Sequence, residues 1–248
     1  ALSESDGNIE EAFKLLREKG IAKAEKKSSR DANEGLIGIK IEDETAAIIE
    51  VNSETDFVSR NAEFHKLVNE VLSISIKNID DDENLKKETT DLINQAIGKI
   101  GENIVLKRYA FLKGNIFSYI HNNVAEGLGK IGVILSIESE NKNMTEVGKN
   151  VCMHVAAASP MSISKDDLDI SIINSERDII KQQLKDTGKP DHILEKMMDG
   201  KLNKFYEEKT LLNQKFVMDP DITVEQYLKK MSDELGSKIS ISKYIRFE

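Results

Sequence analysis

The chain contains two unequal copies of one segment plan, and this internal repeat restricts the possible folds more than any other feature. AAIIEVNSE at 46–54 aligns with GVILSIESE at 132–140. EFHKLVNEVLSIS at 63–75 aligns with VGKNVCMHVAAAS at 147–159, and GENIVLKRY at 101–109 aligns with GSKISISKY at 236–244. The recurrence of these segments in the same order predicts two subdomains with the same arrangement of strands and helices.

The first copy indicates which elements this arrangement contains. An alternating apolar pattern over 37–41 and an apolar run over 47–51 predict a β-hairpin. Apolar residues at helical spacing predict one helix over 64–72 and another over 84–100, and a third strand follows over 104–112. Two strands, helices and one strand indicate an α+β fold with a three-stranded antiparallel sheet in each copy.

The second copy carries an insertion. The offset between the aligned helices is 84 residues and that between the closing strands is 135, so the second copy has 51 extra residues between them. Within 168–207, apolar residues recur at spacings of seven and four on both sides of DTGKPD, which predicts two antiparallel helices, each on the order of 25 Å long. Periodicity leaves open whether this helical hairpin covers the core or projects as a coiled coil. Its narrow apolar seam favours projection, which would suit a protein partner or a homodimer.

A helical segment precedes the two copies. Apolar residues at helical spacing over 8–19 follow an Asp-Gly-Asn cap, and Gly20 is the predicted end of the helix. The next stretch is polar, with mixed charges, and is predicted to be a linker. The predicted division is therefore a helical segment over 1–20, a linker over 21–34, a first α+β subdomain over 35–113, and a second over 114–248 with its helical insertion at about 168–207.

Composition weighs against several classes of function. The chain has 35 Lys and Arg against 44 Asp and Glu, a formal net charge of −9, whereas nucleic-acid binding needs clustered cationic charge. No apolar run approaches the roughly 18 residues of a membrane span, and no signal-peptide pattern opens the chain. The single cysteine, Cys152, excludes an internal disulfide and fits a reducing compartment. We expect a soluble intracellular protein that binds neither nucleic acid nor membrane.

Three patterns that resemble ligand or active sites lack the context that such sites need. GLGKIG at 127–132 matches G-x-G-x-x-G but leads into a predicted strand rather than a helix, so we interpret it as a strand-entry loop. Cys152 and His154 lie two residues apart on a predicted helix, about 200° from each other around its axis, and cannot pair. The histidines have no companions at metal-ligand spacing. We predict no catalytic residue, no cofactor and no metal.

The repeat alignment also assigns environments to these two residues. Cys152 aligns with Val68, a core position in the first copy, so burial accounts for it. His154 aligns with Glu70, which is on the solvent side of the first copy's helix, so we expect a surface histidine. The small residues at 156–158 beside it leave room for a close partner.

The two copies differ most informatively at TDFVSRN, residues 55–61, where the second copy has NKNMTEV. Such a difference suggests a function that only the first copy carries. The alternative is local capping, with Thr55 or Asn61 as a helix N-cap and Phe57 or Val58 packing back on the helix. The residues alone favour capping, but an acid and an aromatic at an exposed turn could also act together on a partner.

TDFVSRN resembles the TDFV signature of the elongation factor Ts family, the guanine-nucleotide exchange factors of elongation factor Tu. Further segments match the family in the same order: DGNIEEAF, LREKGIAKAEKK, EVNSETDFVSRN, KIGENI, SYIH, KIGV, MHVAAASP, TGKP, KFYEE and FVMDP. The resemblance therefore spans nearly the whole chain. It implies the end of a ubiquitin-associated-like helical module, then two duplicated α+β subdomains, with an antiparallel coiled-coil hairpin inserted in the second.

The resemblance also implies a function. Phe57 would enter the nucleotide-binding domain of elongation factor Tu while Asp56 disturbs the groups that hold magnesium, so that GDP leaves. His154 would press toward the partner's phosphate loop. The implied contact residues are Thr55, Asp56, Phe57, Val58, Ile131, Gly132, His154, Val217 and Met218.

The implied partner is elongation factor Tu, GDP-bound or nucleotide-free, in the bacterial cytoplasm or an organelle matrix. Whether two copies of this chain also dimerise within a larger complex stays open. Two other interpretations compete with nucleotide exchange: a non-catalytic scaffold that dimerises through the helical hairpin, and an enzyme that binds a cofactor at GLGKIG. No bond chemistry is implied for the exchange factor itself.

Overall fold

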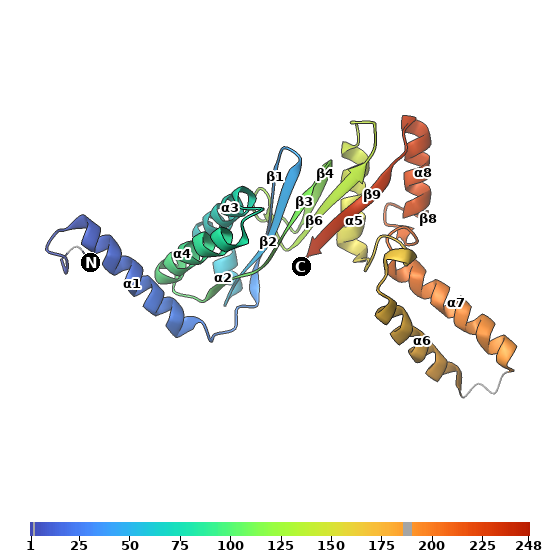
Figure 1. The fold of residues 1–248 in the computed structure, drawn as a ribbon, viewed down its shortest axis with the longest axis horizontal. Helices are drawn as coiled ribbons and strands as arrows, with labels where there is room; N and C mark the ends of the chain where they lie inside the picture. Colours follow the sequence, from blue (N-terminus) through green and yellow to red (C-terminus); the bar gives the residue numbers. More distant parts are fainter. Residues whose placement is uncertain (2, 186–189) are drawn as a thin grey trace. The chain divides into compact units, whose positions relative to one another are not determined.

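The structure is a computed structural model of the 248-residue chain and describes every residue except 2 and 186–189. Strands and helices combine in an α+β fold with antiparallel sheets, as predicted (Figure 1). The chain forms two compact units, Ala1–Ile134 with Tyr244–Glu248, and Leu135–Lys243. The division therefore differs from the predicted boundary after residue 113.

The sheet of the first unit contains the predicted hairpin, β1 (Glu34–Glu42) and β2 (Thr45–Ser53), and β3 (Ile104–Lys113) pairs with β2. A two-residue strand, β5 (Leu128–Gly129), pairs with the other edge of β1, so this sheet has four strands in the order β3-β2-β1-β5 rather than the predicted three. The chain beyond β3 thus returns to the first sheet. This return explains why 114–134 group with the first unit.

Three helices follow the hairpin: α2 (Asp56–Ser59), α3 (Ala62–Lys77) and α4 (Asp82–Ile100). Asn61 caps α3, and Gly101 ends α4 in the left-handed conformation at φ 88°. The helices and one side of the sheet bury a continuous apolar core, as the periodicity predicted. Its members include Leu36, Ile49, Val51, Val58, Phe64, Leu67, Val68, Val71, Leu72, Ile93, Ile97 and Ile104.

The first helix, α1 (Ile9–Lys27), is capped by Asn8 as predicted but continues past the predicted end at Gly20. The Cβ that Gly20 lacks would lie 3.5 Å from a backbone oxygen of α4, and a Cβ on Gly98 of α4 would lie 3.6 Å from the Cα of Gly20. The two glycines therefore permit a close crossing of α1 and α4. Gly20 serves helix packing rather than termination, and the linker shrinks to 28–33.

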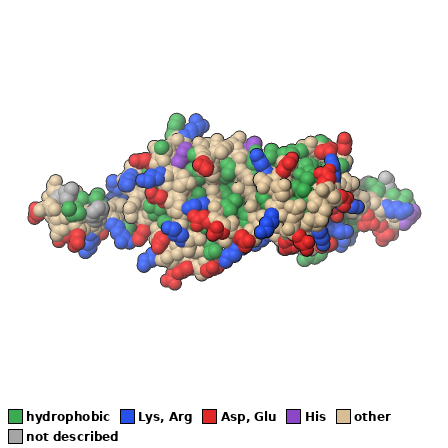
Figure 2. Space-filling view, turned by 90° about the horizontal axis from the view of Figure 1, so that it is seen from above, with side chains coloured by type: hydrophobic (Ala, Val, Ile, Leu, Met, Phe, Trp, Pro, Cys, Tyr) green, Lys and Arg blue, Asp and Glu red, His purple; other side chains and the backbone are tan. Residues whose placement is uncertain are grey.

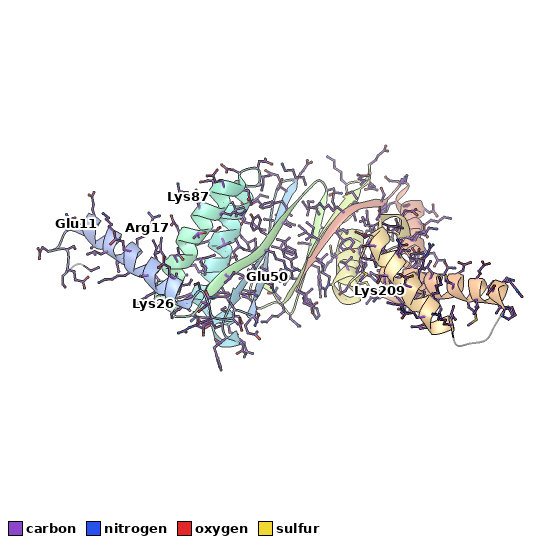
Figure 3. The ribbon with its side chains drawn as sticks, turned by 60° about the horizontal axis from the view of Figure 1, so that its bottom comes forward. Glu11, Arg17, Lys26, Glu50, Lys87 and Lys209 are labelled. Carbon is purple, nitrogen blue, oxygen red and sulfur yellow. The ribbon has the colours of Figure 1, made fainter. Side chains whose placement is uncertain are left out.

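The last residues of the chain contact the first unit through Arg108, which is paired with a buried carboxylate. Glu50 on β2, labelled in Figure 3, is 4 % exposed and accepts hydrogen bonds from Lys107 Nζ at 2.9 Å and Arg108 Nε at 2.5 Å. The guanidinium of Arg108 lies 4.2 Å from the ring centre of Phe247 and donates to the backbone oxygen of Glu248. These contacts account for the place of Tyr244–Glu248 in this unit.

A second sheet has the order β4-β6-β9, formed by β4 (Ile116–His121), β6 (Ile131–Glu138) and β9 (Ser240–Phe247). The repeat alignment pairs β6 with β2 and β9 with β3, and in each sheet these strands are neighbours. The predicted strand after GLGKIG is therefore present, and no helix follows the glycines.

The second unit contains α5 (Thr145–Ala158) and α8 (Val224–Leu235), separated by the insertion. The insertion holds more than the two predicted helices. Its elements are η1 (Lys165–Asp167), α6 (Ile170–Lys185), α7 (Asp191–Lys209), β7 (Lys215–Phe216) and β8 (Asp219–Thr223). Sequence periodicity did not reveal the short β7-β8 ribbon because β7 has only two residues and the five residues of β8, Asp-Pro-Asp-Ile-Thr, show no apolar alternation.

Helices α6 and α7 lie side by side (Figure 1) and form a small core of their own. Ile173, Ile180 and Leu184 of α6 are buried with Leu202 of α7, whereas Ile179 is 46 % exposed. The apolar seam between the two helices is thus narrow. Most of the TGKP connection lies outside the described residues.

Replacing 171–207 by a short Gly/Ser linker is expected to leave a folded protein. The base of the insertion is held separately, because Leu211 N donates to Ser162 O and Met161 N donates to Lys209 O, at 2.9 and 2.8 Å. The helices bury their apolar residues mainly against each other, and a flexible linker closes such a loop at little cost. Circular dichroism and thermal unfolding would check this, with the full chain as control. Loss of cooperative unfolding in the shortened chain would show that the hairpin is part of the core.

Charged side chains of both signs are interspersed over the face of the molecule shown in Figure 2. The described part of the chain contains no helix whose length and apolar character would let it cross a membrane. In the same part of the chain, no three His, Cys, Asp or Glu residues gather where they could hold a metal ion.

Candidate functional site

The single turn α2 exposes one apolar side chain and buries the next. Phe57 is 81 % exposed, whereas Val58 is 9 % exposed and belongs to the core that contains Phe64. The capping interpretation therefore holds for Val58, which packs inward, and for Asn61, which caps α3 by accepting from Glu63 N at 2.8 Å. It does not hold for Phe57, whose ring faces solvent beside the core rather than within it.

The start of α2 is attached to the loop after α4. Thr55 N donates to Glu102 Oε2 at 3.0 Å, and Thr55 Oγ1 donates to Glu102 Oε1 at 2.7 Å. Thr55 occupies the N-cap position of α2, but its side chain makes no cap bond there. The hydroxyl that was one candidate cap thus joins α2 to a residue 47 positions away.

The end of α2 is attached to α3. Ser59 Oγ donates to Asp56 O at 2.9 Å, and His65 Nε2 lies 2.9 Å from Ser59 O. A carbonyl oxygen only accepts, so Nε2 of His65 carries the proton in this contact. The turn that carries Phe57 is therefore held at both ends, although it is only four residues long.

The carboxylate beside Phe57 is paired but accessible. Asp56 Oδ2 lies 2.9 Å from a guanidinium nitrogen of Arg60, and the side chains of Asp56 and Arg60 are 44 % and 74 % exposed. Ion pairs on an exposed surface contribute about 0–1 kcal/mol, so another cationic group can replace Arg60 at little cost. An exposed aromatic ring beside a carboxylate whose ion-pair partner can be replaced is suited to binding a protein surface rather than a small substrate.

The second predicted contact segment, Ile131 and Gly132, lies at the start of β6 and is packed against β1. Gly132 is buried at the start of β6, where a Cβ would lie 2.5 Å from Ile37 Cγ2 and 3.2 Å from Ile39 Cδ1. Glycine is therefore required there by close packing. Ile131 is half-buried, so only part of its side chain faces solvent.

The predicted surface position of His154 is wrong, because this residue is 1 % exposed. Its Nε2 lies 2.9 Å from Gln214 Oε1, and its Nδ1 accepts from Val217 N at 3.2 Å. In the second unit the segment after α7 covers the helix face on which Glu70 is exposed in the first copy. The first copy lacks the insertion, so the alignment could not reveal this cover.

Both ring nitrogens of His154 are used within the protein. The amide oxygen of Gln214 accepts from Nε2, so the ring is neutral with its proton on Nε2 and its lone pair on Nδ1. Burial lowers the pKa of His154 below its usual 6.5, and the bond to Gln214 acts in the opposite direction. Neighbouring Cys152 is buried as predicted, and burial raises the pKa of its thiol far above the usual range.

The His154 contacts support a second exposed apolar group. Val217 and Met218 are 50 % and 46 % exposed, in the turn between β7 and β8. His154 holds the backbone of Val217, and the ring of Phe216 stacks on Tyr227 with 4.3 Å between ring centres. The ribbon thus presents two apolar side chains on a braced turn.

His154 is expected to make folding depend on pH. The unfolded chain protonates this imidazole near pH 6.5, whereas the folded chain does so only at lower pH. Its contribution to stability is therefore present above pH 6.5 and is lost as pH falls toward the folded pKa. Urea unfolding between pH 7.5 and 5 should show a smaller loss in His154→Gln than in the parent chain. Parallel pH profiles of the two proteins would contradict this assignment.

Known proteins match the chain over this entire arrangement. The family model for Elongation factor TS matches residues 54–248, a stretch that begins immediately before Thr55 and contains the β7-β8 turn. The chain belongs to the elongation factor Ts family.

Curated members of the elongation factor Ts family align with nearly all of the chain. The protein from Mesorhizobium japonicum is 44 % identical, over 100 % of this chain and 85 % of its own length. The proteins from Paracoccus denitrificans and Rickettsia felis are each 42 % identical, over 95 % and 100 % of this chain and 82 % and 84 % of their own lengths. The chain is thus a translation elongation factor of this family, as its motifs predicted.

Two residues that contact the candidate site residues were not predicted from the sequence. Glu102 was seen only as part of KIGENI, and Gln214 was not singled out. The one available signal was that Glu102 directly follows Gly101, the predicted end of a helix. Its contact with Thr55 joins residues far apart in sequence, which spacing patterns do not reveal.

Proposed function

We propose that this elongation factor Ts family member is the guanine-nucleotide exchange factor of elongation factor Tu. The observation that carries the proposal is Phe57, an aromatic ring 81 % exposed on an anchored turn beside the carboxylate of Asp56. An exposed aromatic of this kind is typical of the residues that dominate protein interfaces. Membership of the elongation factor Ts family indicates that the partner for this ring is elongation factor Tu.

Phe57 would enter the nucleotide-binding domain of elongation factor Tu, and Asp56 would disturb the groups that hold the magnesium ion. Without the ion, the diphosphate of GDP is poorly neutralised and dissociates faster. The coupling is reciprocal: if this chain weakens GDP binding by some factor, GDP weakens binding of the chain by the same factor. No bond is made or broken, so the chain needs no catalytic residue and no cofactor.

The β7-β8 turn would provide a second contact through Val217 and Met218. The burial of Gly132 and His154 favours supporting roles for them, with His154 holding the backbone of Val217. Ile131 and Thr55 stay predicted contacts. The α6-α7 hairpin would act as a projecting coiled-coil arm for elongation factor Tu or for a second copy of this chain, in the bacterial cytoplasm.

The proposal is tested by the release rate of fluorescent GDP from elongation factor Tu. Adding the chain should accelerate release in a saturable way, and excess magnesium should oppose it. The absence of acceleration at high concentrations of the chain would refute the exchange function. In that case, a hydrodynamic mass that falls when the hairpin is removed would favour the scaffold alternative.

A further inference from the structure

Two segments of the first unit, 54–55 after β2 and 102–103 after α4, are joined by reciprocal hydrogen bonds. A glutamate of each segment accepts from the other segment. Glu102 accepts two hydrogen bonds from Thr55, and in return Glu54 Oε1 accepts from Asn103 N at 2.6 Å. Arg30 adds to this contact, since its guanidinium lies 3.4 Å from Glu54 Oε2 and its backbone oxygen accepts from Asn103 Nδ2 at 2.7 Å. The end of β2 is thereby joined to the end of α4 immediately before α2 begins.

We propose that Glu102 is a positioning residue of the exchange site, which through Thr55 sets the orientation of α2 and so of Phe57. This inference rests on the proposed exchange function. It assigns Glu102 no contact with the nucleotide or the metal. Its effect is on how the aromatic ring is presented to the partner.

The geometry makes Phe57 depend on this contact. A single helical turn is not stable by itself, because nucleation fixes many dihedral angles for few hydrogen bonds. Phe57 lies outside the core, so the backbone of α2 sets the direction in which its ring points. Hydrogen bonds to a carboxylate are about twice as strong as those between neutral groups. The bidentate contact with Thr55 therefore constrains the start of the turn directly.

The position of Glu102 is itself fixed from both sides. Gly101, at φ 88°, ends α4 and directs the chain toward β2, and Asn103 is buried and bonded to Glu54. Removing the Glu102 carboxylate leaves these backbone contacts and the buried Val58 in place. The fold should then persist while α2 samples more orientations, so binding must order the turn at the cost of affinity.

The first test measures GDP release from elongation factor Tu as a function of exchange-factor concentration. Glu102→Ala should raise the concentration for half-maximal stimulation about tenfold and change the plateau rate less than twofold, because ordering α2 penalises binding. Glu102→Gln, whose amide oxygen can still accept one of the two hydrogen bonds, should raise the half-maximal concentration about threefold. Thr55→Val should resemble Glu102→Gln, and the exposed Glu83→Ala is the matched control. Wild-type values in Glu102→Ala would overturn the inference.

The second test separates positioning from general destabilisation. In a Phe57→Ala background, Glu102→Ala should add nothing to the loss of exchange, because it acts through that ring. An additive tenfold loss would overturn the inference. Thermal unfolding of each variant is the control, and Thr55→Val replaces Glu102→Ala if the latter does not fold.

The third test does not need elongation factor Tu. In the free chain, amide hydrogen exchange over residues 55–60 should be about tenfold faster in Glu102→Ala than in the parent, with α3 unchanged. Unchanged protection of 55–60 would overturn the inference even if the chain accelerates GDP release. Faster amide hydrogen exchange over 55–60 in Glu102→Ala, with no acceleration of GDP release by the parent chain, would instead refute the proposed function. The positioning contact would then still be established.

Discussion

Phe57→Ala is expected to reduce stimulation of GDP release by about thirtyfold or more, because truncating a central interface aromatic costs about 2 kcal/mol or more. The free energy of unfolding should change by less than about 0.5 kcal/mol, because the ring is exposed and surface substitutions have small effects. Fluorescent GDP release and thermal unfolding of the same preparation would measure both. Val124→Ala, which truncates another exposed apolar side chain, is the matched control.

The opposite outcome for Phe57 has a clear meaning. A large fall in the unfolding midpoint with unchanged exchange would show that the ring packs on α3, and the capping interpretation would then account for the whole TDFV segment. A loss of exchange with no change in stability would separate the two adjacent residues, Phe57 as the partner contact and Val58 as the core contact.

Phe64→Ala is expected to have the largest effect on stability, a loss of about 3–5 kcal/mol. Phe64 belongs to α3 and is fully buried in the core, together with Val58 and Val68, so truncating its side chain leaves a cavity. For a protein of this size such a loss lowers the unfolding midpoint by roughly 6–20 °C. Urea unfolding would measure it, with Phe64→Leu as the milder control. A loss below about 1 kcal/mol would show that the core is not packed as described.

The two phenylalanines lie seven residues apart and should respond oppositely, although their chemistry is identical. Exposure distinguishes them, since Phe57 is 81 % exposed and Phe64 is 0 % exposed. Periodicity already separated them in part, because Phe64 is in register with Leu67, Val68 and Val71. It left Phe57 with two interpretations, since a ring at the start of a helix can either staple the turn or face a partner.

Much of the fold was predictable because local patterns carried it. The β1-β2 hairpin, α3, α4 with its Gly101 end, β3 and the paired helices of the insertion all follow from alternation or helical spacing, which mark the buried face of each element. The family was predictable from its motifs, TDFVSRN above all. These signals are short in range, and each can be read within one element.

Tertiary structure decided whatever depends on contacts between distant segments. Gly20 looked like a helix end but serves the crossing of α1 on α4, because a missing Cβ permits close approach as readily as it breaks a helix. His154 looked exposed by analogy with Glu70 but is covered by the insertion. The contact between Thr55 and Glu102 was invisible for the same reason. Sequence spacing reports which face of an element is apolar, whereas only the folded chain determines what comes to lie against that face.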